Sequence, residues 1–362
     1  MTEENRLTRR ARYNHAITAG GGLSLSSKPT AARYRYYEVY GLLLASEEPV
    51  AGLTETRAER EADVTIYQHE EPQWVSRVLH GPLEPWEGGD LSAAEAQRSR
   101  RLRWSVSPEG ATRVRYADGT QFVVDETGSK IWTTWEHPLR PTDMALYLLG
   151  PIMGFALAMR GVTVLHGTAI VLDGKAVVLM GPSGSGKSTT AAAFVAGGAG
   201  LLSEDIAALH LVDGRVLVQP GYPSIRLWPD STQMIFESAD ALPLLTPGWE
   251  KRNLQVDTEA RRQFVNDPLP LGAVYYLEDR KDSDDAPAVE PLSCADGLRE
   301  MLENTYVNLQ PRFRTRGAEF ATLSRAATTV PIRRVTPHTD PLRILDLRDS
   351  IAHDFRTSSI SA

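Results

Sequence analysis

The stretch that most constrains this chain is Gly181–Ser188, which reads GPSGSGKS. An apolar run, Ala176–Met180, precedes it, and the alanine-rich segment Thr189–Ala196 follows it. That order predicts a strand, a glycine-rich loop and a helix, which is the context that a phosphate-binding loop requires. The glycines let the backbone turn tightly and point its N–H groups at phosphate oxygens, and the helix N-terminus adds a positive dipole end. A nucleoside triphosphate is therefore the first ligand that the sequence predicts.

The side chains of this loop are expected to contact different parts of the ligand. Lys187 would bridge the β- and γ-phosphates, and the Ser188 hydroxyl would be a ligand of Mg²⁺. We expect ATP or another nucleoside triphosphate, together with Mg²⁺. The loop does not specify the reaction, since hydrolases, switches and kinases all use it. The nucleotide-binding residues that the motif predicts are Gly181, Pro182, Ser183, Gly184, Ser185, Gly186, Lys187, Ser188 and Thr189.

Composition narrows the classes of partner. The chain has 362 residues, 42% of them hydrophobic and 23% charged, which is typical of a globular protein large enough for two domains. Lysine and arginine number 39 against 46 aspartate and glutamate residues, so the net charge of −7 favours neither nucleic acid nor an anionic membrane as a partner. Cys294 is the one cysteine, so no disulfide can form within the chain and a cytoplasmic location is expected.

The longest apolar run, Met144–Met159, is a candidate buried helix. Its 16 residues are too few to span a membrane, and Gly150-Pro151 interrupts the run. We expect the helix to begin at a cap formed by Thr142 or Asp143 and to end at Arg160-Gly161. The polar N-terminus of the sequence does not resemble a secretory signal.

The segment before this helix is predicted to be rich in β-structure. The first 30 or so residues are polar and expected to be partly disordered, and short strands follow as far as Trp135. Within Tyr34–Leu44 the tyrosines alternate as they do in a half-buried strand, and turns at Asp118-Gly119 and Thr127-Gly128 join later strands into hairpins. We expect a mostly antiparallel N-terminal domain over residues 1–139, which either supports the rest of the chain or binds a substrate segment.

Residues 140–362 are predicted to form the P-loop domain, with a mixed α/β sheet. An Asp173-Gly174 turn joins Val162–Leu172 to the strand that enters the P-loop. We therefore expect that entry strand to be paired in a hairpin, whereas most P-loop proteins enter from a parallel arrangement. A strand, Leu201–Leu211, follows the P-loop helix, and Pro220–Trp228 is expected to be a loop. The later pattern predicts helices near 232–239, 297–309, 318–327 and 341–355, and strands at 273–277 and 332–335.

Glu204-Asp205 is the acidic pair that best suits phosphoryl transfer. It follows Lys187 by 17 residues, which is one helix and a turn, so it is expected at the edge of a neighbouring strand. Successive side chains of a strand point to opposite faces, so we expect the two acids to have different tasks. One would face the γ-phosphate as general base, and the other would either help Ser188 to hold Mg²⁺ or anchor a neighbouring side chain. The alternative is an exposed charge pair without a role in chemistry.

Four further residues are candidates for the site. His166, on the strand before the P-loop strand, could contact Glu204 and set the orientation and pKa of that carboxylate, or it could be an ordinary core histidine. Arg226, Lys251 and Arg252 lie in predicted loops after the acidic pair. They would either place positive charge on the γ-phosphate or be ordinary surface cations.

Together these residues resemble the C-terminal domain of HPr kinase/phosphorylase. That family has a His-Gly strand, a P-loop and an Asp-Asp pair on the following strand, and the matching residues are His166-Gly167, Gly181–Ser188 and Glu204-Asp205. The resemblance covers roughly Val162–Trp228. It implies a fold related to the ATP-dependent phosphoenolpyruvate carboxykinases, ATP at the loop and Mg²⁺ near Ser188. It also implies that the first acid is the general base toward a serine hydroxyl, with His166 near it.

A softer likeness covers most of the chain. It is to the HPr-kinase-like serine kinases found beside peptide natural-product genes, including the tailoring kinases of lasso peptides. This likeness implies a serine of a peptide or protein as the phosphoryl acceptor. The segments that carry it are Tyr37–Ala45, Ala62–Val64, Leu165–Gly167, Pro220–Pro223, Arg226–Trp228, Lys251-Arg252 and Leu269–Leu277.

Two departures from the family pattern bear on the mechanism. The first acid is Glu204 rather than Asp, which leaves open whether Glu204 or Asp205 is the base. The family's C-terminal segment, rich in Pro, Gly, Arg and Asn, has no counterpart, so neither phosphorylation of HPr nor the reverse reaction is expected.

Four functions remain after these arguments. The first is an ATP- and Mg²⁺-dependent kinase that acts on a hydroxyl, most simply a serine of a peptide or protein. The second is a kinase of the same fold that acts on a free amino acid, a sugar or a nucleoside. The third is a non-catalytic nucleotide-binding protein, and a homo-oligomer is left open for each. The fourth, a phosphoenolpyruvate carboxykinase, is disfavoured because the sequence lacks the Lys/His metal-ligand set of that family.

Overall fold

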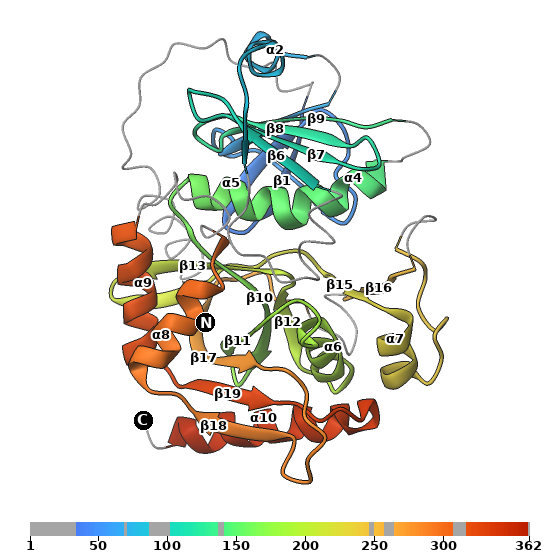
Figure 1. Cartoon of the computed structure of the whole chain (residues 1–362), viewed down its shortest axis with the longest axis vertical. Coiled ribbons are helices and arrows are strands. Elements are labelled where there is room, and N and C mark those ends of the chain that lie inside the picture. The colour runs from blue at the N-terminus through green and yellow to red at the C-terminus, as the bar shows by residue number, and fades with distance from the viewer. Residues whose placement is uncertain are drawn as a thin grey trace.

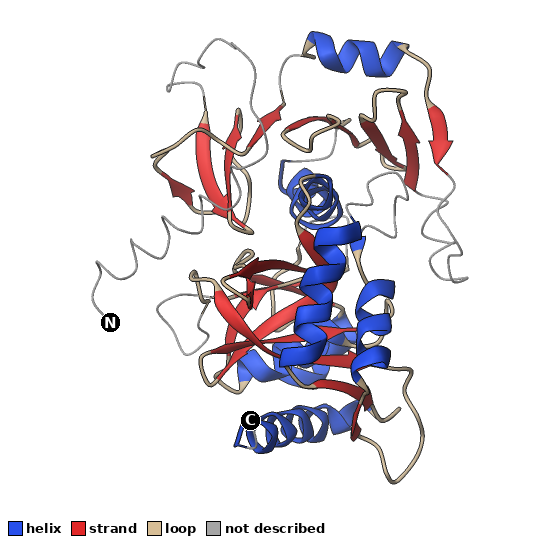
Figure 2. Cartoon of the chain, turned by 90° about the vertical axis from the view of Figure 1, so that its left-hand side faces the viewer, coloured by secondary structure: helices blue, strands red, loops and turns tan. Residues whose placement is uncertain are grey.

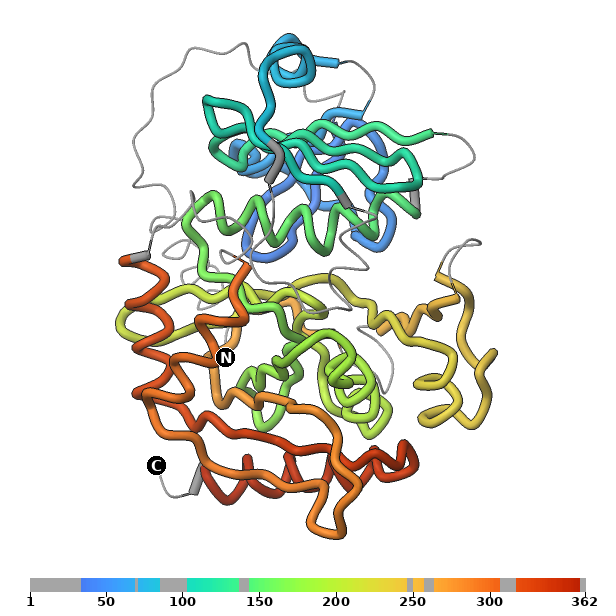
Figure 3. Tube along the Cα trace, in the orientation of Figure 1, coloured from blue at the N-terminus to red at the C-terminus, as the bar shows by residue number. Residues whose placement is uncertain are grey.

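The computed structural model describes residues 34–68, 71–86, 102–136, 141–245, 250–256, 264–306 and 316–360. The disorder expected for the first 30 residues lies outside this part of the chain. The described residues form a mixed α/β molecule with two large sheets, and an interrupted helix lies between them (Figure 1). Figure 3 shows the chain passing from the N-terminal sheet through this helix into the C-terminal sheet.

The first sheet has nine strands in the order β3-β1-β2-β4-β9-β8-β7-β6-β5. The pairs β2–β4 and β4–β9 are parallel, and the other pairs along this path are antiparallel. Helix α2 (Gln73–His80) packs on the outer face through Val75 and Val78. The strands are β1 (Arg35–Val39), β2 (Leu42–Ser46), β3 (Glu55–Thr56), β4 (Val64–Tyr67), β5 (Glu84–Trp86), β6 (Leu102–Val106), β7 (Thr112–Tyr116), β8 (Gln121–Val124) and β9 (Lys130–Thr134).

The tyrosines of Tyr34–Leu44 do not all lie on one half-buried strand as expected, because the segment is a tight hairpin. Strand β1 ends at Val39, and Tyr40-Gly41 forms the turn into β2. Both turn residues have positive φ, 55° at Tyr40 and 78° at Gly41. Alternating aromatic residues predict extended backbone, and a single glycine after them was too weak a signal for the turn.

The apolar run forms a buried helix that is interrupted at the Gly150-Pro151 pair noted in the sequence. It consists of α4 (Pro141–Tyr147), a wider π-helical turn (Leu148–Ile152) and α5 (Met153–Met159). Gly150 has non-helical angles, φ −97° and ψ −107°, and Pro151 has no N–H to donate. The Gly-Pro pair therefore breaks the helical hydrogen bonds in the middle of the run.

The C-terminal sheet holds the P-loop strand. Strand β11 pairs with β10 in an antiparallel hairpin across the Asp173-Gly174 turn, which confirms the expected entry to the loop. On its other edge β11 pairs in parallel with β17, which in turn pairs in parallel with β19. The strands are β10 (Thr163–Leu172), β11 (Lys175–Met180), β12 (Gly200–Ser203), β13 (Ile206–Val212), β14 (Arg215–Val218), β17 (Leu269–Leu277), β18 (Ala288–Pro291) and β19 (Ile332–Thr336).

Helices cover both faces of this sheet (Figure 2). Alternate residues of β11 show why, since Val177 and Leu179 pack with α6 and α10 while Val178 and Met180 pack with α8 and α9. A smaller hairpin, β15 (Ser224–Leu227) with β16 (Arg252–Gln255), replaces much of the loop expected at 220–228. The helices are α6 (Lys187–Ala196), α7 (Pro229–Phe236), α8 (Cys294–Glu303), α9 (Arg316–Thr329) and α10 (Ile344–Ile360).

Strand directions decide where a ligand can approach. Because β11, β17 and β19 are mutually parallel, their carboxyl ends meet at one edge, and the P-loop follows the end of β11 there. Open α/β sheets bind ligands at this edge. Among the helices of the described residues, none combines the length and apolarity needed to cross a membrane.

Candidate functional site

The P-loop connects β11 directly to the first turn of α6. Gly181, Gly184 and Gly186 have φ of 143°, 93° and 101°, in the left-handed region that side chains disfavour. At Gly181 a Cβ would lie 2.3 Å from the carbonyl oxygen of Leu277, at the end of the neighbouring parallel strand. Position 181 therefore requires glycine, both because of its positive φ and because a side chain would clash with the neighbouring strand.

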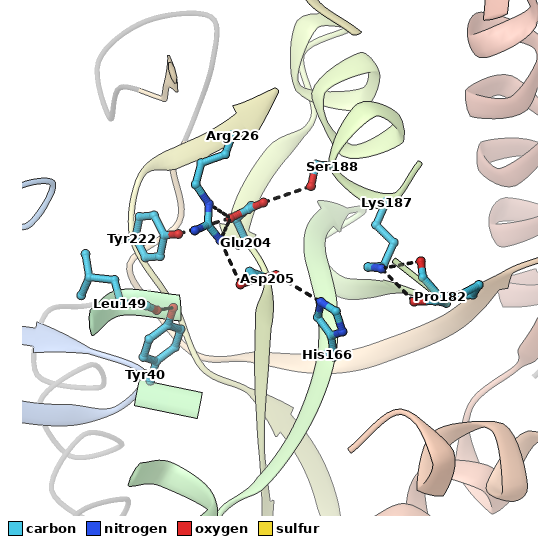
Figure 4. A network of polar contacts seen from close by, with 11 residues as sticks. Tyr40, Leu149, His166, Pro182, Lys187, Ser188, Glu204, Asp205, Tyr222 and Arg226 are labelled. Carbon is cyan, nitrogen blue, oxygen red and sulfur yellow. Dashed lines mark hydrogen bonds and ion pairs between the residues drawn. The ribbon is translucent and has the colours of Figure 1, made fainter. Parts of the chain in front are cut away.

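The lysine of the motif lies over its own loop. Lys187 Nζ donates hydrogen bonds to the carbonyl oxygens of Gly181 at 2.8 Å and Pro182 at 3.0 Å (Figure 4). Thr189, also predicted to bind nucleotide, instead shares a 2.8 Å hydroxyl contact with Ser231 of α7. These contacts hold the start of α6 in place on the side from which phosphates would approach.

The acidic pair lies in a break between two strands rather than within the single strand expected over Leu201–Leu211. Strand β12 pairs with β10 through Ser203, and β13 begins to pair with β10 at Ile206 opposite His166. Asp205 bridges the two with a φ of 67°. The side chains of Glu204 and Asp205 do not point to opposite faces as regular strand geometry predicts, because this left-handed residue reverses the alternation.

Both carboxylates contact one guanidinium instead. Arg226 Nη2 lies 2.9 Å from Glu204 Oε2 and 2.9 Å from Asp205 Oδ2 (Figure 4). Its Nε donates a further hydrogen bond of 3.1 Å to Glu204. Strand β15 positions Arg226, so the structure brings this predicted cation to the acids, although on a strand and not in a loop.

Glu204 is almost completely enclosed, with 3% of its surface exposed. Its Oε1 accepts a hydrogen bond of 3.0 Å from the Ser188 hydroxyl, and its Oε2 accepts one of 3.2 Å from Tyr222. Burial raises the pKa of Tyr222, so the phenol keeps its proton and acts as donor. The bond from Ser188 joins the phosphate loop to the acidic pair.

His166 contacts Asp205, not the expected Glu204. The distance from His166 Nε2 to Asp205 Oδ1 is 3.2 Å. The strand pairing explains this, because the first residue of β13 lies opposite His166 and Asp205 directly precedes it. Burial disfavours the charged carboxylate of Asp205, but Arg226 and His166 outweigh that effect and hold its pKa well below the usual range.

Two predicted cations take other partners. Lys251 Nζ lies 5.0 Å from the ring centre of Trp228, a cation–π contact. Arg252 pairs with Asp240 and donates to the carbonyl of Ala239 at 3.1 Å. These contacts lie around the antiparallel pair β15–β16 and the end of α7. A role of Lys251 and Arg252 at the γ-phosphate therefore stays a prediction.

Sequence reasoning missed two contributors to the site. Tyr222 was noted only within the segment Pro220–Pro223, and nothing marked its hydroxyl as a partner of Glu204. Gly150 was noted only as a helix interruption, yet a Cβ there would lie 3.1 Å from Asp205 Oδ2. The turn-forming residues on either side of Tyr222, in Pro220–Pro223, could have drawn attention to it. The closeness of Gly150 to Asp205 depends on tertiary packing alone.

The residues present fit a magnesium ion held jointly with phosphates. Mg²⁺ commonly binds one or two protein oxygens, several waters and substrate phosphate oxygens. Ser188 Oγ and Glu204 Oε1 are adjacent oxygens at the start of α6. The described residues contain no group of three His, Cys, Asp or Glu side chains suited to hold a metal by themselves, so the phosphates would have to complete the coordination.

Comparisons with known proteins do not assign this chain to a family. No protein-family model matches the sequence, and no curated protein matches it. Among solved structures, the HPr(Ser) kinase/phosphatase from Coxiella burnetii aligns over 55% of this chain and 99% of its own. Sequence identity is 11% and the TM-score is 0.30. At that level of similarity a function for this chain has to be argued from its own residues.

Proposed function

We propose that this protein is an ATP- and Mg²⁺-dependent kinase that transfers the γ-phosphoryl group to a hydroxyl, with a serine of a peptide or protein as acceptor. One observation carries the proposal. The 3.0 Å hydrogen bond from Ser188 to Glu204 joins the phosphate-binding loop to a buried acidic pair that shares Arg226. A phosphate loop, a metal-binding hydroxyl and carboxylates at one place are the parts that phosphoryl transfer needs.

The two acids differ in their surroundings, and this divides their roles. Glu204 is buried and bonded to Ser188, so we assign it to the metal side, where Mg²⁺ would neutralise charge on the β- and γ-phosphates. Asp205 has 23% of its side chain exposed and His166 has 40%, so this pair can meet an acceptor. The low pKa of Asp205 keeps it ionised. It therefore suits a carboxylate that orients the acceptor hydroxyl.

In the transfer step, the acceptor oxygen forms a bond to the γ-phosphorus as the bond to the β-bridging oxygen breaks and ADP leaves. The acceptor proton passes to the Asp205 carboxylate at Oδ1, the oxygen that lies beside His166 Nε2. Lys187 and the loop N–H groups hold the phosphates in line, and Arg226 fixes both carboxylates. Positioning and charge stabilisation account for most catalysis in reactions of this kind.

The nucleoside end of the triphosphate would extend along the carboxyl ends of β17 and β19. A pocket borders the P-loop there, lined by Gly186, Thr190, Met234, Arg280, His338 and Arg343. Its cationic side chains suit the α-phosphate and ribose. This leaves the opposite side, at His166, for the acceptor.

The choice of acceptor rests on the sequence likeness to tailoring kinases of peptide natural products. A free amino acid, a sugar or a nucleoside is the second acceptor class. The partly exposed His166–Asp205 pair is compatible with either class. The third alternative is a protein that binds the nucleotide and transfers no phosphoryl group. We also propose a cytoplasmic location.

Transfer from γ-labelled ATP tests the proposal, with serine peptides, free serine and threonine, sugars and nucleosides as acceptors. We expect Lys187→Ala and Glu204→Gln each to lower the rate on the order of a thousandfold, because each removes charge from the phosphate or metal. Lys130→Ala and Glu290→Gln are matched controls on exposed strand positions and should leave the rate unchanged.

The outcomes separate the alternatives. Unchanged transfer in both Lys187→Ala and Glu204→Gln would show the mechanism to be wrong. Tight ATP binding without product across all acceptors would support the non-catalytic protein. Product on free amino acids or sugars but not on peptides would support a small-molecule kinase.

A further inference from the structure

Tyr40 is a buried residue of the N-terminal sheet that lies close to the acidic pair. It forms the tip of the β1–β2 hairpin, has φ 55° and is 0% exposed. A tyrosine in the left-handed region is sterically disfavoured, so surrounding contacts must hold it there. Those contacts come from two segments outside its own sheet.

Each of these segments receives one hydrogen bond from Tyr40. Its hydroxyl donates to the carbonyl oxygen of Leu149 at 2.8 Å, and its backbone N–H donates to the carbonyl oxygen of Pro220 at 2.7 Å. Burial raises the pKa of Tyr40, which keeps the donor proton in place. Figure 4 shows the tyrosine and Leu149 beside the network of the acids.

The first segment is the interruption of the α4–α5 helix. Leu149 precedes Gly150, the residue with non-helical angles. Beyond its closeness to Asp205, the Cβ position of Gly150 lies 3.6 Å from Arg226 Nη1. A shift of the Leu149 carbonyl would therefore move backbone that lies against the Asp205–Arg226 ion pair.

The second segment runs from Pro220 to Arg226. Tyr222, two residues after Pro220, donates to Glu204 Oε2, and Arg226 follows on β15. The Cβ position of Gly221 lies 3.0 Å from Tyr40 Cε1, so the tyrosine ring packs directly against this segment. Tyr40 thus contacts both of the backbone segments that enclose the acidic pair.

We propose that Tyr40 is a positioning residue for Glu204 and Asp205, and that the N-terminal hairpin is thereby a working part of the phosphoryl-transfer site. The proposal rests on the proposed function for its kinetic consequence. Its structural consequence, that Tyr40 keeps residues 149–153 and 219–226 well ordered, holds whether or not the protein is a kinase. The N-terminal sheet is then more than a support.

Tyr37 provides a matched control within the same hairpin and the same core cluster. It is also buried, at 1% exposure, and its hydroxyl accepts a 3.2 Å hydrogen bond from the N–H of Val50, in the connection between β2 and β3. If Tyr40 only filled the core, Tyr40→Phe and Tyr37→Phe would behave alike. If Tyr40 positions the acids, only Tyr40→Phe should disturb the backbone around Glu204 and Asp205.

The experiment compares both variants with the wild-type full chain by hydrogen–deuterium exchange and by transfer kinetics. Tyr40→Phe removes the hydroxyl bond to Leu149 but keeps the ring and the backbone N–H that contact residues 220–221. We therefore expect faster exchange at residues 149–153 and a fall in kcat of about tenfold, with the KM for ATP unchanged, because misplacing reacting groups slows the step after binding. In Tyr37→Phe we expect neither change.

Equal exchange of residues 149–153 in the two variants would overturn the proposal, whether or not the protein transfers phosphate. Equal kcat values for wild type and Tyr40→Phe, in a protein that does transfer, would overturn it as well. Absence of transfer in the wild type, combined with faster exchange in Tyr40→Phe alone, would refute the proposed function and leave the positioning contact supported.

Discussion

At the scale of single residues, Arg226 is the cation that balances both carboxylates of the site. One guanidinium, 10% exposed, contacts two carboxylates that are 3% and 23% exposed. Burial disfavours its charge, but the carboxylates outweigh that effect and raise the pKa of Arg226. Arg226→Met keeps the length of the side chain and leaves two acids without their cation. We expect a loss of about 3–5 kcal/mol in the free energy of unfolding, measured by urea denaturation.

The control for this prediction is Arg35→Met. Arg35 is 47% exposed and pairs with Glu55, which is 52% exposed, so its loss should leave the free energy of unfolding nearly unchanged. Equal losses in the two variants would show that the Arg226 network adds nothing special to stability.

At the scale of elements, the packing of β13 in the sheet creates a pH-sensitive position. His210 lies opposite Leu217 of β14, and burial lowers its pKa to about 4. An unfolded histidine takes up its proton near pH 6.5, so between about pH 6.5 and 4 the unfolded chain binds more protons than the folded one. The contribution of neutral His210 to the free energy of unfolding is therefore fully present above pH 6.5. The free energy of unfolding falls by up to about 3 kcal/mol as the pH drops to 4.

Urea unfolding of wild type and His210→Gln across this range measures the effect. The difference between the two curves should change with pH only between about 6.5 and 4. His80→Gln, at an exposed position on α2, should follow the wild-type curve. A constant difference between wild type and His210→Gln would contradict the prediction.

At the scale of the whole molecule, the two sheets share one hydrophobic core. A single buried cluster includes Leu44 of the first sheet, Phe155 of the helix between the sheets and Ile206 of the second sheet. Five of the seven tryptophans precede residue 140, so fluorescence reports mainly on the first sheet. Circular dichroism reports mainly on the later helices. We expect both signals to give the same urea midpoint, since unfolding either sheet exposes the shared core.

Leu44→Ala extends this prediction. It should lower the free energy of unfolding by about 2–5 kcal/mol and move both midpoints together. Two separated transitions, or a shift in fluorescence alone, would instead indicate two independent domains divided near residue 139.

The described part of the chain shows where local sequence signals suffice. The P-loop, the hairpin before it and the start of α6 follow from glycine positions and apolar runs that act over a few residues. The break at Gly150-Pro151 follows from local sequence as well, since both residues disfavour a helix interior. The turn at Tyr40 and the division of the strand at Glu204-Asp205 did not follow, because each needs contacts with residues far away in the sequence to hold a non-glycine residue at positive φ.

Residue type and local spacing are enough to predict a phosphate-binding loop, its entry from a hairpin and several candidate site residues. Which of these candidates contact one another depends on the tertiary structure. It joined Ser188 to Glu204, His166 to Asp205 and both acids to Arg226, while Lys251 and Arg252 took other partners. Side-chain partnership depends on how strands pair and where they break, and that is settled by packing over the whole chain.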